Sequence, residues 1–89
     1  MRRRSEKVPL LMARPGLFRI VSINAGRAMR ERLYRMGISE GDIVRVVSNP
    51  SYGPVIVQKG NTRVGIGAGM ASRIFVQPLE VMENVENLR

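Results

Sequence analysis

The sequence contains neither cysteine nor histidine among its 89 residues. Their absence excludes disulfide bonds, zinc sites built on thiolate or imidazole, cysteine nucleophiles and histidine general bases. Only seven residues are acidic, and they form no cluster. Because oxygen-ligand metal sites and pairs of catalytic carboxylates both need acidic residues close together, we expect no catalytic residue, no metal site and no cofactor.

Aromatic residues are also scarce, with two phenylalanines, two tyrosines and no tryptophan. Domains that bind single-stranded nucleic acid stack bases on several aromatic side chains. We expect Phe18 and Phe75 to lie in the core, which leaves only Tyr34 and Tyr52 for such a surface. The composition therefore gives little support to nucleic-acid binding.

The chain has no long apolar run either. None approaches the roughly 20 residues that span a bilayer. The basic start at Met1–Arg4 is followed by a short apolar stretch without a small-residue cleavage site, unlike a signal peptide. We therefore expect a soluble, cytoplasmic protein.

What the sequence has in excess is positive charge, with a formal net charge of +8. Residues 1–45 carry eleven lysines and arginines against four acidic residues, whereas residues 46–89 carry four against three. A basic half of this kind is typical of a protein with an acidic partner, such as nucleic acid, an anionic membrane surface or an acidic protein surface. A solvated basic surface without a partner is the alternative.

The length allows one domain, because the remaining residues could not build a second core. We assign residues 1–7 to a flexible basic arm, residues 8–80 to the folded domain and residues 81–89 to a polar tail. The basic residues of the arm, Lys7 included, have nothing to pack against. Near an anionic leaflet each would contribute about 1 kcal/mol of attraction, so we expect the arm to favour a membrane surface without being needed for folding.

Short β-branched segments separated by glycine and proline predict strands. In the first of them Phe18 and Ile20 would face one side and Ile23 the other. A helix follows this strand, Gly60-Asn61 predicts a hairpin turn, and a helical turn at 67–72 precedes the last strand. These elements predict a mainly β fold, a small and strongly curved barrel whose closure protects its edges. The expected strands cover residues 17–23, 42–48, 54–58, 62–66 and 73–78.

Between residues 27 and 36 the apolar period becomes helical, with Met29, Leu33 and Met36 on one narrow stripe. Gly37 follows as a residue that can adopt a positive φ, so that Ile38 can pack back onto Leu33 in a Schellman motif. The opposite arc of the helix carries Arg27, Arg30, Glu31, Tyr34 and Arg35.

The outer arc of this helix should tolerate substitution. Arg30 and Arg35 lie off the apolar stripe by helical geometry, so we expect both to be replaceable without disturbing the core.

Three glycines alternate in the run Gly65-Ile66-Gly67-Ala68-Gly69. A phosphate-binding P-loop would need a Lys-Ser/Thr pair after its glycines, and a dinucleotide fingerprint would need a longer βαβ unit. Neither is present. We interpret the run as a tight backbone crossing at a corner of the barrel.

Six methionines could suggest thioether ligands for a soft metal ion. Met29 and Met36 lie on the helical stripe, and Met12 and Met70 stand beside apolar neighbours in the sequence. We therefore expect the methionines to fill gaps in the core.

The run from Arg32 to Val44, RLYRMGISEGDIV, resembles the signature of the ferrous iron transport protein A family. That signature has a basic-Leu pair, a Leu or Met before glycine, an aliphatic residue, a turn ending in glycine and a Val-rich strand. The segment Pro15–Ile23 is similar to the opening strand of the family. The later landmarks that match are Gly53-Pro54-Val55, the Gly60-Asn61 hairpin and Ala71–Val76.

The resemblance covers about residues 9–79, with one departure inside the domain: many members have an aliphatic-Leu-Arg run where this chain has residues 64–68. It implies an SH3-like barrel. It also implies a small cytoplasmic protein that accompanies the large ferrous iron permease, a membrane protein with a cytoplasmic GTPase domain. The same fold closes some iron-dependent repressors, which explains the family's label as metal-binding.

The leading hypothesis is therefore a non-enzymatic accessory or regulatory protein of ferrous iron uptake that docks on the cytoplasmic GTPase part of the permease, and through it lies at the inner membrane. Tyrosine and arginine are enriched at interface centres, so we expect the contact to use the basic helix face and the loop around Tyr52. The alternatives are a small-barrel nucleic-acid-binding protein and a metal-responsive regulatory domain. The predicted partner-binding residues are Arg27, Arg30, Tyr34, Arg35, Tyr52 and Lys59.

Overall fold

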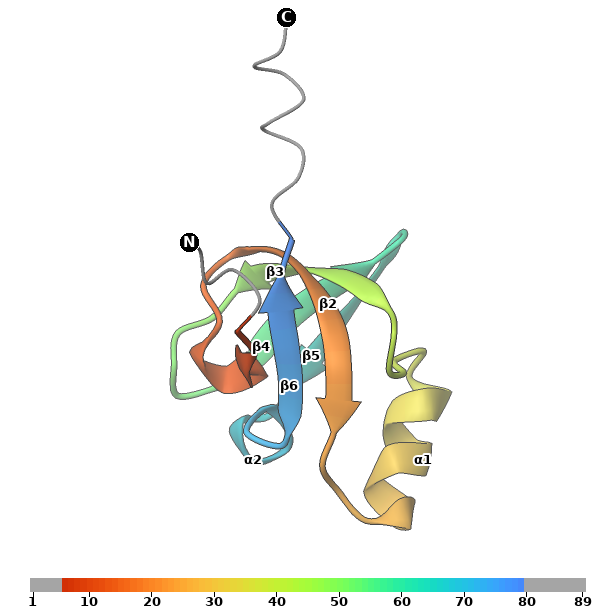
Figure 1. Cartoon of the computed structure of the whole chain (residues 1–89). Coiled ribbons are helices and arrows are strands. Elements are labelled where there is room, and N and C mark those ends of the chain that lie inside the picture. The colour runs from red at the N-terminus through yellow and green to blue at the C-terminus, as the bar shows by residue number, and fades with distance from the viewer. Residues whose placement is uncertain (1–5, 80–89) are drawn as a thin grey trace, which may run out of the picture.

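The computed structural model describes residues 6–79, which form one curved sheet of six strands with two α-helices and a 3₁₀ turn (Figure 1). The helices are α1 (Arg27–Arg35) and α2 (Ala68–Ala71), and the 3₁₀ turn is η1 (Leu10–Met12). The strands are β1 (Val8–Pro9), β2 (Gly16–Ile23), β3 (Ile43–Ser48), β4 (Val55–Lys59), β5 (Thr62–Ile66) and β6 (Ile74–Pro78).

The strands follow the order β1-β6-β2-β3-β4-β5, and each pairs antiparallel with its neighbour. Inward-facing valine and isoleucine side chains and Phe18 from β2 to β6, joined by Leu10, Leu33 and Ile38, form a single core. The fold is thus mainly β, an SH3-like barrel with one helix after its first long strand, as predicted. The expected closure of the sheet is not seen within residues 6–79, because no strand there pairs with the second side of β5. No helix of the described part of the chain is long and apolar enough to cross a membrane.

The sequence pattern missed one strand and misplaced one side chain. β1 has only two residues, too few for an alternating pattern to reveal. Ile23 was predicted to face away from Phe18 and Ile20, but all three are buried in the core. The pairing of β2 with β6 shifts register between Ile20 and Ser22. This bulge inserts one residue and turns Ile23 back to the inner face.

The carboxyl end of α1 is the local structure that the sequence predicted best. Gly37 has φ +90°, and its N–H donates to the carbonyl of Tyr34 at 2.9 Å. The N–H of Ile38 donates to the carbonyl of Leu33, also at 2.9 Å. These two bonds define a Schellman motif. Leu33 and Ile38 are both buried, so the motif also anchors the helix to the core.

Three predictions about the amino-terminal side of the domain and the last strand were wrong. Phe75 is only half-buried, because it lies on β6 between two inward-facing residues. The ammonium group of Lys7 lies 5.8 Å from the centre of its ring, so Lys7 does have a packing partner. Met12 is 69% exposed, because η1 directs Leu10 into the core and leaves the other end of the turn outside. The remaining residues of the predicted arm, 1–5, lie outside the described part.

The predicted backbone crossing near the alternating glycines exists, but another glycine permits it. A Cβ at Gly67 or Gly69 would meet nothing within 4 Å. A Cβ at Gly53, by contrast, would lie 2.9 Å from the backbone nitrogen of Ala68. The loop between β3 and β4 therefore passes closely over the start of α2. Gly53, which also has a positive φ of 84°, makes this close approach possible.

Candidate interaction surface around helix α1

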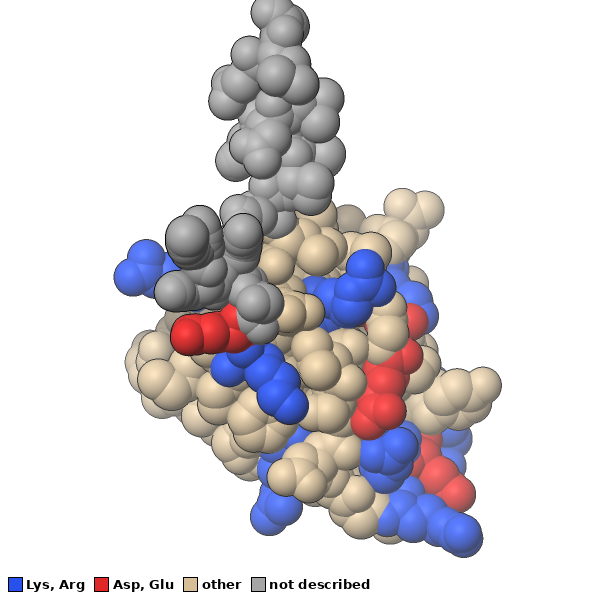
Figure 2. All heavy atoms as spheres, viewed as in Figure 1, with Lys and Arg blue, Asp and Glu red and all other residues tan. Residues whose placement is uncertain are grey.

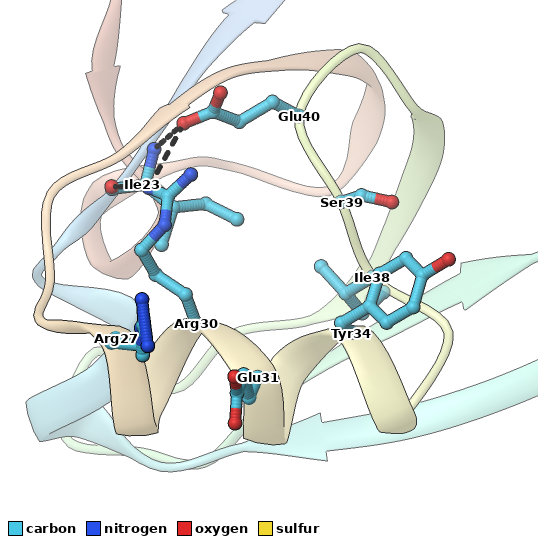
Figure 3. Close-up of a pocket in the computed structure, with 8 residues that line it drawn as sticks. All are labelled: Ile23, Arg27, Arg30, Glu31, Tyr34, Ile38, Ser39 and Glu40. Carbon is cyan, nitrogen blue, oxygen red and sulfur yellow. Dashed lines mark hydrogen bonds and ion pairs between the residues drawn. The ribbon is translucent and has the colours of Figure 1, made fainter.

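Helix α1 stands beside the sheet at one end of the barrel, and a pocket of about 390 Å³ opens between it and the following turn (Figures 1 and 3). Lysine and arginine side chains gather over this end of the molecule, with acidic side chains among them (Figure 2). The pocket is lined by Ile23, Arg27, Arg30, Glu31, Tyr34, Ile38, Ser39 and Glu40.

Arg30 points into this pocket and is bonded there (Figure 3). Its Nη1 donates to the carbonyl oxygen of Ile23 at 2.7 Å and lies 3.4 Å from Oε2 of Glu40. The same Glu40 oxygen accepts the backbone N–H of Ile23 at 2.9 Å. Arg30 and Glu40 therefore hold the end of β2 against α1. Arg30 lies outside the core, as expected, but its replacement would remove these contacts, which the helical period did not predict.

The pKa of the Glu40 carboxyl is held below its ordinary value of 4.5. The main cause is the hydrogen bond from the Ile23 N–H, which favours the charged carboxylate, and the positive charge of Arg30 adds to it. Partial burial opposes both effects. Glu40 is thus a charged structural acceptor rather than a carboxyl poised to exchange a proton at neutral pH.

Lys59 is bonded in a similar way on the other side of the turn. Its Nζ donates to the carbonyl oxygen of Gly37 at 2.9 Å and to Oδ2 of Asp42 at 3.0 Å. Oδ2 of Asp42 also accepts the N–H of Ser39 at 2.8 Å. Lys59 therefore fastens the segment after α1 to the hairpin of β4 and β5, and its charge lies at the negative end of the helix beside the carbonyl of Gly37.

On α1, three of the predicted contact residues point to solvent without an internal partner, and we call Arg27, Tyr34 and Arg35 the outer face of α1. The Tyr34 side chain is 71% exposed although it is aromatic. The side chains of Arg27 and Arg35 are exposed and make no hydrogen bond or ion pair with any other residue of 6–79. An exposed tyrosine flanked by unpaired arginines has the composition of an interface anchor.

Tyr52, the sixth predicted contact residue, lies away from this face. Its loop is held to η1, because the Asn49 side chain donates to the carbonyls of Leu11 and Ala13 at 2.9 and 2.7 Å. This loop and α1 lie on different sides of the barrel (Figure 1). The structure thus brings Arg27, Arg30 and Tyr34 to one pocket, with Arg35 on the same helix, and it separates them from Tyr52. The Tyr52 side chain is 82% exposed and forms no part of the helix surface.

No group of three or more acidic side chains within residues 6–79 is arranged to hold a metal ion. Glu40 and Asp42, the nearest carboxylates to the turn after α1, already accept hydrogen bonds from backbone and cationic groups. Sequence reasoning missed these structural roles. The partners are ten residues apart for Arg30 and Glu40 and seventeen for Lys59 and Asp42, and no helical or strand period links them.

Comparison with known proteins identifies the family. A protein of Methanocaldococcus jannaschii named as an Fe(2+) transport protein A is 38% identical over 73 residues, which is 81% of this chain and 88% of the relative. The protein in the crystal structure of an iron uptake regulatory protein (FeoA) is 35% identical in sequence to this chain, and the two structures superpose with a TM-score of 0.77. The match covers 83% of this chain and all of the other chain. A manganese-dependent transcriptional repressor has a TM-score of 0.76 at 23% identity.

The repressor match covers 84% of this chain but 43% of the repressor, so it shows a shared fold only. The model of the FeoA domain family, in contrast, matches residues 8–78, from β1 to the last residue of β6. With the sequence identity to a named transport protein, this match shows that the chain belongs to the FeoA domain family, which takes part in Fe(2+) transport.

Proposed function

We propose that this protein is a non-enzymatic accessory of ferrous iron uptake that docks on the cytoplasmic GTPase part of the ferrous iron permease through the outer face of α1. Membership of a family involved in Fe(2+) transport supports the process. The observation that supports the surface is the exposed Tyr34 between Arg27 and Arg35, two arginines without a partner among residues 6–79. A partner surface with carboxylates would satisfy both guanidinium groups.

Docking is tested with the purified cytoplasmic domain of the permease and two variants of this protein. Tyr34→Ala combined with Arg35→Glu removes the aromatic anchor and reverses one charge, while leaving the bonded Arg30 in place. Like charges across an interface cost up to several kcal/mol, roughly, so binding should be lost. Arg45→Glu on β3 is the matched control, because Arg45 is exposed and lies outside the α1 pocket.

If the Tyr34/Arg35 variant binds the permease domain as tightly as the wild type does, the outer face of α1 is not the docking surface. Salt dependence separates docking from nucleic-acid binding by the same arginines. Association with nucleic acid falls steeply and independently of base sequence as salt rises.

We further propose that a membrane surface assists this docking through the basic residues at the start of the chain. The proposal rests on sequence alone, since residues 1–5 lie outside the described part. Sedimentation with anionic vesicles should fall when residues 1–5 are removed. Equal sedimentation of both forms would exclude a role for the arm.

A further inference from the structure

A groove runs between α1 and strand β5, on the side of the helix that faces away from the pocket of Figure 3 and carries its methionines. It consists of two hollows of about 580 and 420 Å³ that share Met36. From α1 it takes Met29, Arg32 and Met36, and from β5 it takes Val64, Gly65 and Ile66. Its helix wall is mostly apolar, because Met29 and Met36 are only half-buried.

The strand presents its edge to this groove. Alternate residues of a strand point to opposite faces, yet the consecutive residues 64 to 67 all line the groove. Ile66 as a whole is only 1% exposed and its side chain lies in the core, so the accessible backbone of this stretch is that of its glycine neighbours. Gly65 and Gly67 are exposed and leave the backbone uncovered.

β5 is also the last strand of the sheet. It pairs with β4 on one side, and among residues 6–79 no strand pairs with its other side. The N–H and C=O groups along such an edge are a template for another strand. Five residues of strand span about 17 Å, so the edge offers room for an extended segment of about that length.

The charges around the groove select the kind of segment. Every charged residue that lines it is basic, namely Arg32, Lys59 and Arg73. Lys59 is already bonded to Asp42. The guanidinium groups of Arg32 on α1 and Arg73 after α2 make no hydrogen bond or ion pair within residues 6–79, although both line the same hollow. Two unpaired guanidinium groups at one hollow are suited to a carboxylate, which arginine binds through paired hydrogen bonds.

We propose that the groove between α1 and β5 binds an extended acidic segment of a partner protein, which adds to β5 as a further strand and places a carboxylate between Arg32 and Arg73. Main-chain bonds to β5 would hold the segment, and methionine side chains, which adapt to different shapes, would cover its apolar residues. The site is distinct from the outer face of α1 and does not depend on docking to the permease. Loss of either interaction leaves the other measurable.

The probe is a synthetic seven-residue peptide of alternating valine and threonine with two glutamates at one end and both termini blocked. Titrated into the full-length protein labelled with ¹⁵N, it should shift the amide signals of β5 and of α1 between Met29 and Met36, and it should saturate. A second peptide, N-methylated at alternate residues, lacks the main-chain N–H donors along one of its edges and cannot pair with β5 through that edge. It should bind at least about tenfold more weakly.

A double variant tests the charges. Arg32→Gln combined with Arg73→Gln should lower the affinity for the glutamate peptide by about tenfold or more. Arg45→Gln is the control, because it removes one exposed arginine from β3, outside the groove. A peptide with lysines in place of the glutamates should not bind the wild type. The proposal is overturned if no peptide saturates at millimolar concentration, if the N-methylated peptide binds equally well, or if the double variant binds as the wild type does.

Discussion

The charges around α1 divide into two groups that look alike in the sequence and differ in the fold. In the bonded group, Arg30, Glu40, Asp42 and Lys59 join α1 to the end of β2 and to the hairpin of β4 and β5. On the outer face, Arg27 and Arg35 are exposed and have no partner within residues 6–79. Residue type does not distinguish Arg30 from Arg35, whereas their surroundings in the fold do.

The difference has a physical cause. A guanidinium that meets a backbone carbonyl and a carboxylate at a half-buried position replaces its water contacts with fixed ones, so it contributes to stability. An exposed guanidinium keeps its water and contributes little to the fold, but its charge remains available to a partner. The bonded group therefore belongs to the architecture, whereas the outer face remains available for the docking that we propose.

The largest expected contrast lies between two consecutive residues of α1. Leu33 is fully buried, so Leu33→Ala should lower the free energy of unfolding by about 3 kcal/mol, through lost apolar contacts and the cavity that remains. Tyr34→Ala, at a 71% exposed position, should change it by less than about 0.5 kcal/mol. Urea unfolding of both variants measures the contrast, and equal losses would contradict the assignment of the two faces.

The helix cap provides the next contrast. Gly37 has φ +90°, so Gly37→Ala should cost about 1 kcal/mol of stability. Gly69 lies within α2 with open space around its Cα, so Gly69→Ala should be neutral or stabilising by about 0.5 kcal/mol. Thermal melts compare the two. A melting temperature that stays the same in Gly37→Ala would argue against the Schellman motif.

A smaller difference in stability is expected between variants of Arg30 and Arg35. Arg30→Gln should cost about 1 kcal/mol, because it weakens the bonds to the Ile23 carbonyl and to Glu40. Arg35→Gln should stay within about 0.5 kcal/mol of the wild type. In binding to the permease domain the order should reverse, with Arg35→Gln the weaker binder. If Arg35→Gln is the less stable of the two variants, the division between bonded group and outer face fails.

The smallest effect is a dependence on pH carried by Glu40. Its pKa is lower in the folded protein than its ordinary value of 4.5, so the folded state favours the carboxylate. The stabilisation is complete above the ordinary pKa and is lost as pH falls through the lower folded pKa. It is modest because Glu40 is 42% exposed.

Urea midpoints from about pH 6 to about pH 3 should therefore fall less in Glu40→Gln than in the wild type. The control is Glu31→Gln, because the Glu31 side chain makes no hydrogen bond or ion pair within residues 6–79. If the urea midpoint of Glu40→Gln falls with pH as steeply as that of the wild type, the Glu40 carboxylate does not contribute to the acid sensitivity.

Most of the local structure was predictable, since short-range periodicity specifies it. The β5 strand was predicted with its exact bounds, the Gly60-Asn61 turn joins the expected strands, and the cap at Gly37 follows from one glycine and one apolar residue. The candidate surface was less predictable. Helical geometry put Arg30 and Arg35 together on the outer arc, and it could not show that only Arg30 would meet the end of β2.

The sequence by itself determined the mainly β barrel with its capped helix, the excess of positive charge and the family. All of these depend on composition or on residues close together along the chain. Only the tertiary structure decided that Ile23 turns inward at a bulge, that Lys59 fastens the end of α1, that Tyr52 lies apart from the helix face, and that the edge of β5 lies open beside Arg32 and Arg73. These features depend on which distant segments meet when the sheet curves, and no pattern within one segment encodes that meeting.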